Sequence, residues 1–445
     1  MKDISDLKLR PRSLTNIFTA VRPGRYMLAA ALTAVTTFSG ITTLQAGDYY
    51  SFQIMIPNLG PAFTAQISYS VCSAAGSDSV VAVTPAGGAW ATGQAVAVSA
   101  GGTSAGLNSE IVVWSLSTVL VKKSLVRTDS PTQARSLVAW RVQMPSGVQP
   151  TVPNLGSYYW AQDNQSWPMM KSASQAVAGV DTPANFTTTA VTAEGGATNP
   201  FYVGIKYTST KWGKQFLICG DSIMEGLGGN ARFFGGVQRA ACNLSTPDNP
   251  IEWFNSAQHA QTPYVYAANM AQSIALVNPT SVWYAPYTIN NITKSATSPG
   301  LTAAIKEEDY WGLATLSRVC AALPRQPSIF ISEPLPNAIY DSSSGTGATT
   351  AANDSLRQAF ITELASFGND PTPALVTSTG LTAVSIMRQG FTVVKGLSAS
   401  WADPTLVNGQ QVPKADALGT DRTHPLELGY TRDIEPVYRP YAEAA

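Results

Sequence analysis

The chain has 445 residues and no formal net charge, because 28 Lys and Arg residues balance 28 Asp and Glu residues. This length exceeds one ordinary domain and favours two or three. Only 13% of the residues are charged, about half of the usual ~25%, so uncharged polar side chains must cover much of the surface. No basic block is dense enough to bind phosphates, which argues against a nucleic-acid partner.

The N-terminal segment has two open interpretations. Residues 1–25 contain prolines and several basic residues without periodicity, and we predict an N-terminal arm there. Residues 26–46 carry no charge and suit either a secretory signal cleaved near Ala46 or a connection into the first domain, and we favour the second. The stretch is too polar for a confident membrane span.

The first half of the chain has a β-type pattern. Short runs rich in Val, Ile, Tyr and Phe alternate with clusters of Gly, Ser, Pro and Asn, and no long helical segment interrupts them. We therefore predict a β-rich accessory domain of sandwich or jelly-roll type over residues 26–205. The predicted strands are residues 49–56, 62–71, 79–85, 94–100, 110–116, 136–144 and 200–207.

Residues 206–445 have a different pattern, in which strands alternate with helices. Such alternation predicts an α/β domain, a parallel sheet with helices on both faces. Ligands and reactive groups in such sheets lie at the carboxyl ends of the strands. We predict strands at 215–219, 251–255, 281–287, 328–332 and 374–378, and helices at about 231–243, 264–277, 303–323 and 355–367.

A candidate nucleophile follows the first of these strands, in the sequence Gly220-Asp221-Ser222-Ile223. A backbone N–H at the start of a helix favours negative charge. That environment suits a serine that must generate an oxyanion beside itself. The alternative is that Asp221 or Ser222 only caps the helix.

A candidate general base lies near the C-terminus. The chain has two histidines, His259 and His424, and Asp421 stands three residues before His424. A carboxylate at this spacing can fix the imidazole tautomer and stabilise the imidazolium. The alternative is a structural surface histidine.

Two loops offer hydrogen-bond donors for an oxyanion. Residues 287–291 follow the third strand and include Asn290, whose amide can donate to a developing negative charge. Residues 255–262 follow the second strand and could present a backbone N–H. The alternatives are an ordinary turn and an ordinary strand–helix connection.

Taken in order, these segments resemble the SGNH/GDSL hydrolase family. The resemblance rests on GDSI at 220–223, on Asn290, and on the Asp-x-x-His-Pro sequence at 421–425, and it covers about residues 215–430. It implies a flavodoxin-like, three-layer α/β/α fold that uses no metal or other cofactor.

The resemblance also implies roles for individual residues. Ser222 would be the nucleophile, His424 the base, and Asp421 the residue that orients His424. The oxyanion hole would consist of the N–H groups of Ser222 and Ala260 and the side-chain amide of Asn290.

The sequence departs from the family pattern in the two middle segments. Ala260 stands where the family has glycine, and alanine would add strain of about 1 kcal/mol if the position requires a positive φ. The third segment reads Thr288-Ile289-Asn290-Asn291 instead of Gly-x-Asn-Asp. His259 and Asn291 are candidate substrate-binding residues, with structural roles as the alternative.

These features favour a serine esterase that works through an acyl-enzyme. Because β-sandwich modules often bind glycans, the sequence favours an O-acetyl esterase acting on carbohydrate. A lipid or aryl ester hydrolase with the same residues is an alternative, as is a structural or adhesive virion-type protein with a degenerate hydrolase domain. An extracellular or virion-associated protein is expected, and assembly into a homo-oligomer or on a virion or cell surface stays open.

Overall fold

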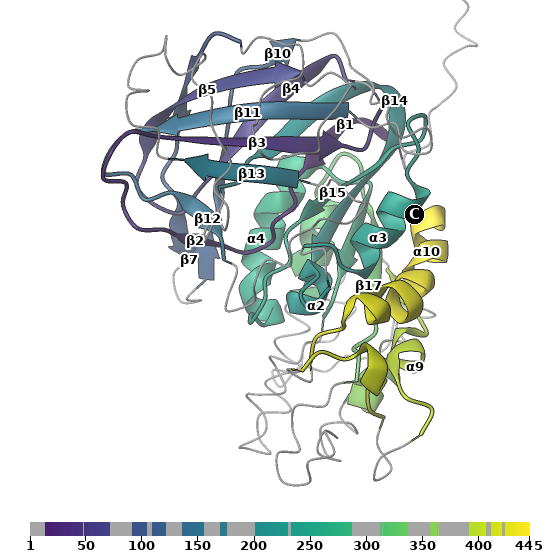
Figure 1. Ribbon diagram of the computed structural model, residues 1–445. Helices are drawn as coiled ribbons and strands as arrows, with labels where there is room; N and C mark the ends of the chain where they lie inside the picture. The colour runs from purple at the N-terminus through teal and green to yellow at the C-terminus, as the bar shows by residue number, and fades with distance from the viewer. Residues whose placement is uncertain are drawn as a thin grey trace, which may run out of the picture.

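The computed structural model (Figure 1) combines antiparallel sheets with a parallel sheet that is flanked by helices. Part of the chain is described by the structure. The described residues are 14–47, 49–71, 91–104, 109–121, 136–154, 170–175, 201–229, 233–286, 312–313, 315–336, 357–362, 364, 391–405, 411–420 and 423–445.

One long strand belongs to both kinds of sheet. Strand β14 (Gly204–Cys219) pairs in its first half with β1 (Thr15–Ala20) and β4 (Ser51–Asn58), both antiparallel. Its second half pairs in parallel with β15 (Ile251–Asn255) and β16 (Ser281–Tyr284). The antiparallel and parallel regions are therefore joined by continuous backbone hydrogen bonding.

The parallel region has the strand order of a flavodoxin-like fold. Its strands run β15-β14-β16-β17-β18, with β17 at Ser328–Ser332 and β18 at Thr392–Val394. Numbered along the chain, this order is 2-1-3-4-5, the flavodoxin-like arrangement. The α/β fold class expected from the sequence is confirmed. The order reverses between β14 and β16, and the carboxyl ends of these two strands mark the expected place for a site.

Alternating side chains of the parallel strands supply two apolar cores. Leu217 and Cys219 of β14 point to one face, where α4 (Pro263–Val277) and the helical residues 315–321 cover them. Strand residues are often buried on both faces in such sheets, which explains their continuous apolar runs.

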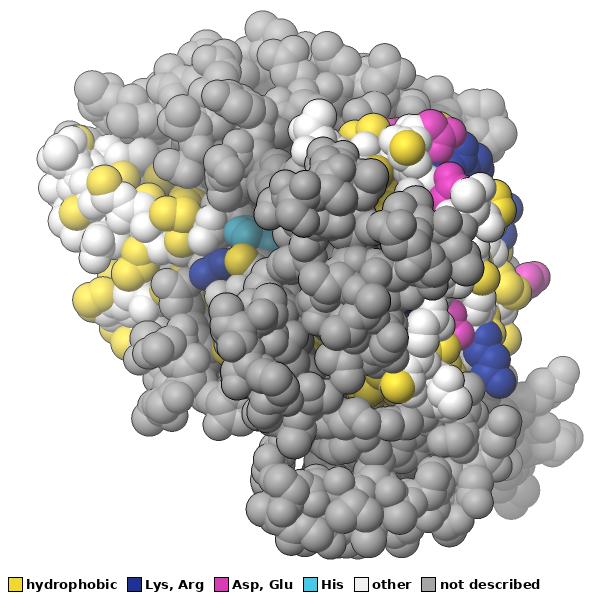
Figure 2. Space-filling view, turned by 90° about the horizontal axis from the view of Figure 1, so that it is seen from below, with side chains coloured by type: hydrophobic (Ala, Val, Ile, Leu, Met, Phe, Trp, Pro, Cys, Tyr) yellow, Lys and Arg dark blue, Asp and Glu magenta, His cyan; other side chains and the backbone are white. Residues whose placement is uncertain are grey.

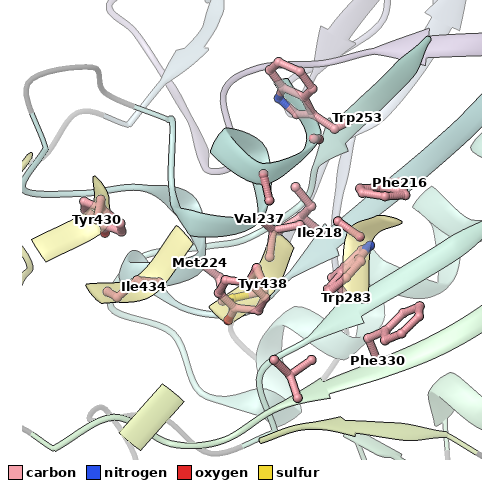
Figure 3. Close-up of a cluster of buried hydrophobic side chains, with 14 of the residues drawn as sticks. Phe216, Ile218, Met224, Val237, Trp253, Trp283, Phe330, Tyr430, Ile434 and Tyr438 are labelled. Atoms are coloured by element: carbon pink, nitrogen blue, oxygen red, sulfur yellow. The ribbon is translucent and has the colours of Figure 1, made fainter. Parts of the chain in front are cut away.

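The opposite face holds the larger aromatic side chains (Figure 3). Phe216 and Ile218 of β14 pack there beneath α3 (Gly236–Leu244) and α10 (Glu435–Ala444). Trp283 stacks on Phe330 with ring centroids 4.4 Å apart. Burial of each such side chain stabilises the fold by about 1.5–3 kcal/mol. Sheet and helices thus form three layers.

Short elements complete the α/β region. Helix α2 (Ser222–Glu225) follows β14, and α9 (Leu397–Trp401) follows β18. A 3₁₀ turn at Ala415–Ala417 and a π-helical segment at Gly429–Ile434 precede α10.

A five-stranded antiparallel sheet shares a core with the first half of β14. Its strands are, in order, β13 (Met170–Gln175), β3 (Thr36–Leu44), β11 (Ser136–Met144), β5 (Phe63–Val71) and β6 (Gln94–Val98). Phe38 and Trp140 from this sheet pack with Phe52 of β4 and Tyr207 of β14. Two sheets therefore enclose one core, whereas a jelly-roll topology stays a prediction. The remaining described strands are β2 (Tyr26–Leu28), β7 (Gly102–Ser104), β8 (Ser109–Ile111), β9 (Val113–Leu116), β10 (Leu120–Val121) and β12 (Thr151–Pro153).

The N-terminal segment is built into the sheets. Residues 15–20, inside the expected arm, form β1 beside β14, and residues 36–44 form β3 between β13 and β11. The domain limits placed at 25/26 and 205/206 stay predictions, although β14 runs through the second without a break. Within the described ranges, no helix is long and apolar enough to cross a membrane.

Candidate active site

Ser222 lies at the carboxyl edge of the parallel sheet, at the first turn after β14. Gly220 lets the chain turn there, because a Cβ at this position would meet the side chain of Met224 at 2.5 Å. Asp221 caps α2 by accepting a hydrogen bond from the N–H of Ile223 at 3.0 Å. Asp221 therefore caps the helix, which leaves the side chain of Ser222 available for another role.

The imidazole of His424 reaches this serine from the far end of the chain. His424 Nε2 lies 2.6 Å from Ser222 Oγ, and the two residues are 8% and 4% exposed. At this distance the serine hydroxyl can donate its proton to the imidazole. The two groups that the sequence analysis paired are brought together.

The loop that carries His424 is fixed by close backbone contacts. The carbonyl of His424 accepts a hydrogen bond from the N–H of Gly419 at 2.8 Å. Gly228 has a φ of +91°, and a Cβ there would meet the carbonyl oxygen of Pro425 at 2.5 Å and the Cβ of His424 at 2.8 Å. Glycine at 228 thus allows the segment after α2 to pack closely against His424 and Pro425.

Asp221 is an acidic residue next to the Ser222–His424 pair. Burial raises the pKa of its carboxyl, while hydrogen bonds from backbone N–H groups, with Ile223 first among them, and the nearby charge of His424 act in the opposite direction. Since its carboxylate already accepts the capping hydrogen bond, Asp221 serves the start of α2.

Main-chain hydrogen bonds connect the segments after β15 and β16 to the turn that precedes Ser222. The N–H of Gln258 donates to the carbonyl of Gly220 at 2.8 Å, and the N–H of Ala285 donates to the carbonyl of Cys219 at 3.0 Å. The residues directly after β15 and β16 therefore lie against the turn after β14, whereas residues 287–291 of the third expected loop lie outside the described part of the chain.

Ala260, the expected oxyanion donor of the second loop, has a left-handed backbone conformation with φ 58°. L-residues other than glycine, asparagine and aspartate adopt this region at a cost of about 1–2 kcal/mol. The family pattern has glycine here, and the backbone shows why. The strain expected for alanine if this position requires a positive φ is therefore present.

Replacing Ala260 by glycine is expected to raise the thermal unfolding midpoint. The strain relieved, about 1 kcal/mol, exceeds the roughly 0.5 kcal/mol of added unfolded-chain entropy. The matched control is Ala257→Gly in the same loop, which does not share the positive φ and loses a buried methyl group. Equal destabilisation by both substitutions would contradict the strain argument.

A hydrogen-bonded carboxylate that sequence reasoning missed lies behind this loop. Glu225, at the end of α2, is fully buried, and its Oε2 lies 2.8 Å from Nδ1 of His259. Seen from below, a histidine side chain adjoins a Lys or Arg side chain on the surface (Figure 2). The sequence offers one signal for Glu225: it is an acidic residue three positions after Ser222, on the same short helix α2.

Three of the expected site residues fall outside the described part of the chain. These are Asp421, the expected orienting carboxylate, and Asn290 and Asn291 of the third loop. Their assignments stay predictions. Among the residues that the structure describes, no group of His, Cys, Asp and Glu side chains could hold a metal ion.

Fold and site together define an α/β protein with a serine–histidine pair at the carboxyl edge of a parallel sheet. No family model matches the chain, and no curated protein matches it either. Solved structures with a similar fold include proteins whose descriptions carry the name GDSL, the family that the sequence motifs resemble.

One such structure is a GDSL-like lipase from Bacteroides thetaiotaomicron, 13% identical, covering 52% of this chain and 88% of its own, with a TM-score of 0.34. Another is an acetylxylan esterase from Geobacillus stearothermophilus, 17% identical, covering 52% and 94%, with a TM-score of 0.34. A third is an α/β hydrolase from the metagenome of Lake Arreo, Spain, 17% identical, covering 52% and 95%, with a TM-score of 0.33. At these scores the assignment of function depends on the geometry of the site.

Proposed function

We propose that the chain is a serine hydrolase of carboxylic esters. The observation that carries the proposal is the 2.6 Å contact between His424 Nε2 and Ser222 Oγ, at the carboxyl end of β14. An imidazole in this position can remove the hydroxyl proton as the oxygen attacks a carbonyl carbon.

In the proposed reaction, Ser222 Oγ attacks the ester carbonyl and His424 takes its proton. The N–H groups of Ser222 and Ala260 and the amide of Asn290 donate to the tetrahedral oxyanion. The leaving alcohol takes the proton from His424, and an acyl-enzyme remains. Water then attacks the acyl-enzyme by the same route, with Asp421 proposed to orient the imidazole throughout.

For the substrate we propose an O-acetyl ester on a carbohydrate. Both reacting side chains are nearly buried, which favours a small acyl group. The antiparallel sheets continue into the hydrolase sheet through β14, which suits an accessory surface for an extended glycan. His259 and Asn291 are proposed to contact the alcohol part of the substrate. We propose an extracellular or virion-associated setting, in keeping with the low charge of the chain.

A series of p-nitrophenyl esters tests the acyl preference. The acetyl ester is expected to be hydrolysed with the highest kcat/KM, at least tenfold above the octanoyl ester, because a long chain must enter a nearly buried site. A preference for long chains would instead indicate a lipid ester hydrolase. Release of acetate from acetylated xylan tests the carbohydrate assignment directly.

Labelling with a fluorophosphonate tests the enzyme assignment independently of substrate choice. Stoichiometric modification that maps to Ser222 by peptide mass spectrometry is expected, since such probes report an activated serine. Unmodified Ser222 in folded protein would favour a structural role for the domain.

A further inference from the structure

The carboxylate of Glu225 joins three segments that are distant in the sequence. Its Oε2 accepts hydrogen bonds from the N–H of His259 at 2.9 Å and from Nδ1 of the same residue at 2.8 Å. Its Oε1 accepts from the N–H of Arg25 at 3.1 Å. A fully buried carboxylate is expensive unless donors surround it, so this arrangement fixes all three partners.

The guanidinium of Arg25 completes the connection. Arg25 Nη1 donates to the carbonyl oxygen of His259 at 3.0 Å. The chain can approach this closely because Gly24 precedes Arg25, and a Cβ at 24 would lie 1.9 Å from the carbonyl oxygen of Ala257. The N–H, the carbonyl and the ring of His259 are therefore all held by Arg25 and Glu225.

These contacts act on the peptide group between His259 and Ala260. The carbonyl oxygen of His259 and the N–H of Ala260 belong to one planar trans peptide, in which they point in opposite directions. A donor that fixes the carbonyl therefore fixes the direction of the N–H. It also polarises the peptide, which strengthens the N–H as a donor. Ala260 itself has the strained φ of 58°, a conformation that surrounding contacts must maintain.

We propose that Arg25 and Glu225 are positioning residues that aim the Ala260 N–H at the oxyanion. The N-terminal segment then completes the active site, although Arg25 lies about two hundred positions from the serine in sequence. This inference rests on the proposed esterase function. Neither residue needs to touch the substrate, because both act through the 259–260 peptide.

The activity test uses Arg25→Met and Glu225→Gln in the full chain, with p-nitrophenyl acetate. Each is expected to lower kcat by about 10- to 100-fold, less than loss of a whole oxyanion donor, while KM changes less than about twofold. Arg25→Lys, which keeps a cationic donor, is expected to recover part of the loss. The matched controls Arg439→Met and Glu435→Gln remove an ion pair on α10 and are expected to leave kcat unchanged.

Hydrogen exchange gives a readout that does not depend on activity. In Glu225→Gln, deuterium uptake of a peptide spanning residues 255–262 is expected to accelerate, because the His259 N–H no longer faces a carboxylate. Unchanged uptake would overturn the positioning role even if the wild-type chain proved to hydrolyse no ester. Wild-type kcat in both Arg25→Met and Glu225→Gln would overturn it as well, and so would equal losses in the α10 controls.

Discussion

Replacement of Ser222 by alanine is expected to reduce kcat for p-nitrophenyl acetate by at least ~10⁴-fold. The substitution removes the oxygen that forms the acyl bond, so no rearrangement of His424 can substitute for it. Residual activity would come only from binding and oxyanion donors acting on water. The measurement is steady-state hydrolysis followed at the absorbance of p-nitrophenolate.

The fold should be unaffected by this change, because only one small hydroxyl is lost, at the first residue of a short helix. A matched control is Ser256→Ala, at the carboxyl end of the adjacent strand β15. Ser256 is also buried, and its Oγ contacts the Oγ of Ser273 at 3.1 Å. Ser256→Ala should keep most of the activity. Turnover that survives Ser222→Ala would remove the basis for the esterase assignment.

The second large effect is expected on stability, at the buried ion pair between Arg22 and Glu252. Arg22 Nη1 lies 2.6 Å from Glu252 Oε1, and the two side chains are 2% and 0% exposed. The other carboxylate oxygen accepts from the N–H of Gln45 at 3.0 Å and from the hydroxyl of Tyr207 at 2.9 Å. This ion pair links Arg22 of the N-terminal segment to Glu252 of β15.

Arg22→Met is expected to destabilise the protein by about 3–5 kcal/mol, because it leaves a buried carboxylate without its cation. The double variant Arg22→Met/Glu252→Gln should lose less than the sum of the single losses, since the two groups compensate each other. The exposed pair of Lys211 and Asp248 provides the control, and Lys211→Met should cost less than about 1 kcal/mol. Urea unfolding followed by tryptophan fluorescence measures Arg22→Met, Glu252→Gln, the double variant and Lys211→Met.

Equal, small effects of Arg22→Met and Lys211→Met would contradict the assigned role of the buried pair. Additive losses in the double variant would show that the two side chains act independently.

The sequence predicted the strands with strong apolar character. Residues 251–255 and 328–332 were expected as strands and form β15 and β17 over those ranges. Strand β3 was not expected, because threonine and glycine dilute its apolar pattern (TTFSGITTL). The short β18 was missed as well, since three residues carry no readable period. The strands expected at 79–85 and 374–378 lie outside the described residues.

The serine–histidine pair was predictable because its motif places each residue next to a recognisable neighbour. Gly220 and Asp221 mark the turn before Ser222, and Pro425 follows His424. Glu225 and Arg25 were missed because their contact spans 200 positions and depends on a main-chain N–H, which every residue except proline offers. Such contacts leave no trace in residue type, so only the folded chain reveals them.

The continuity of β14 determines how the α/β region can be moved between proteins. A cassette cut at residue 205 or 206 would divide a single strand and leave its first residues without β1 and β4 beside them. Such a cassette would also lack Arg22, so Glu252 would face an empty site in the interior. A chimera that receives residues 206–445 is therefore expected to need the N-terminal strands β1 and β4 as well.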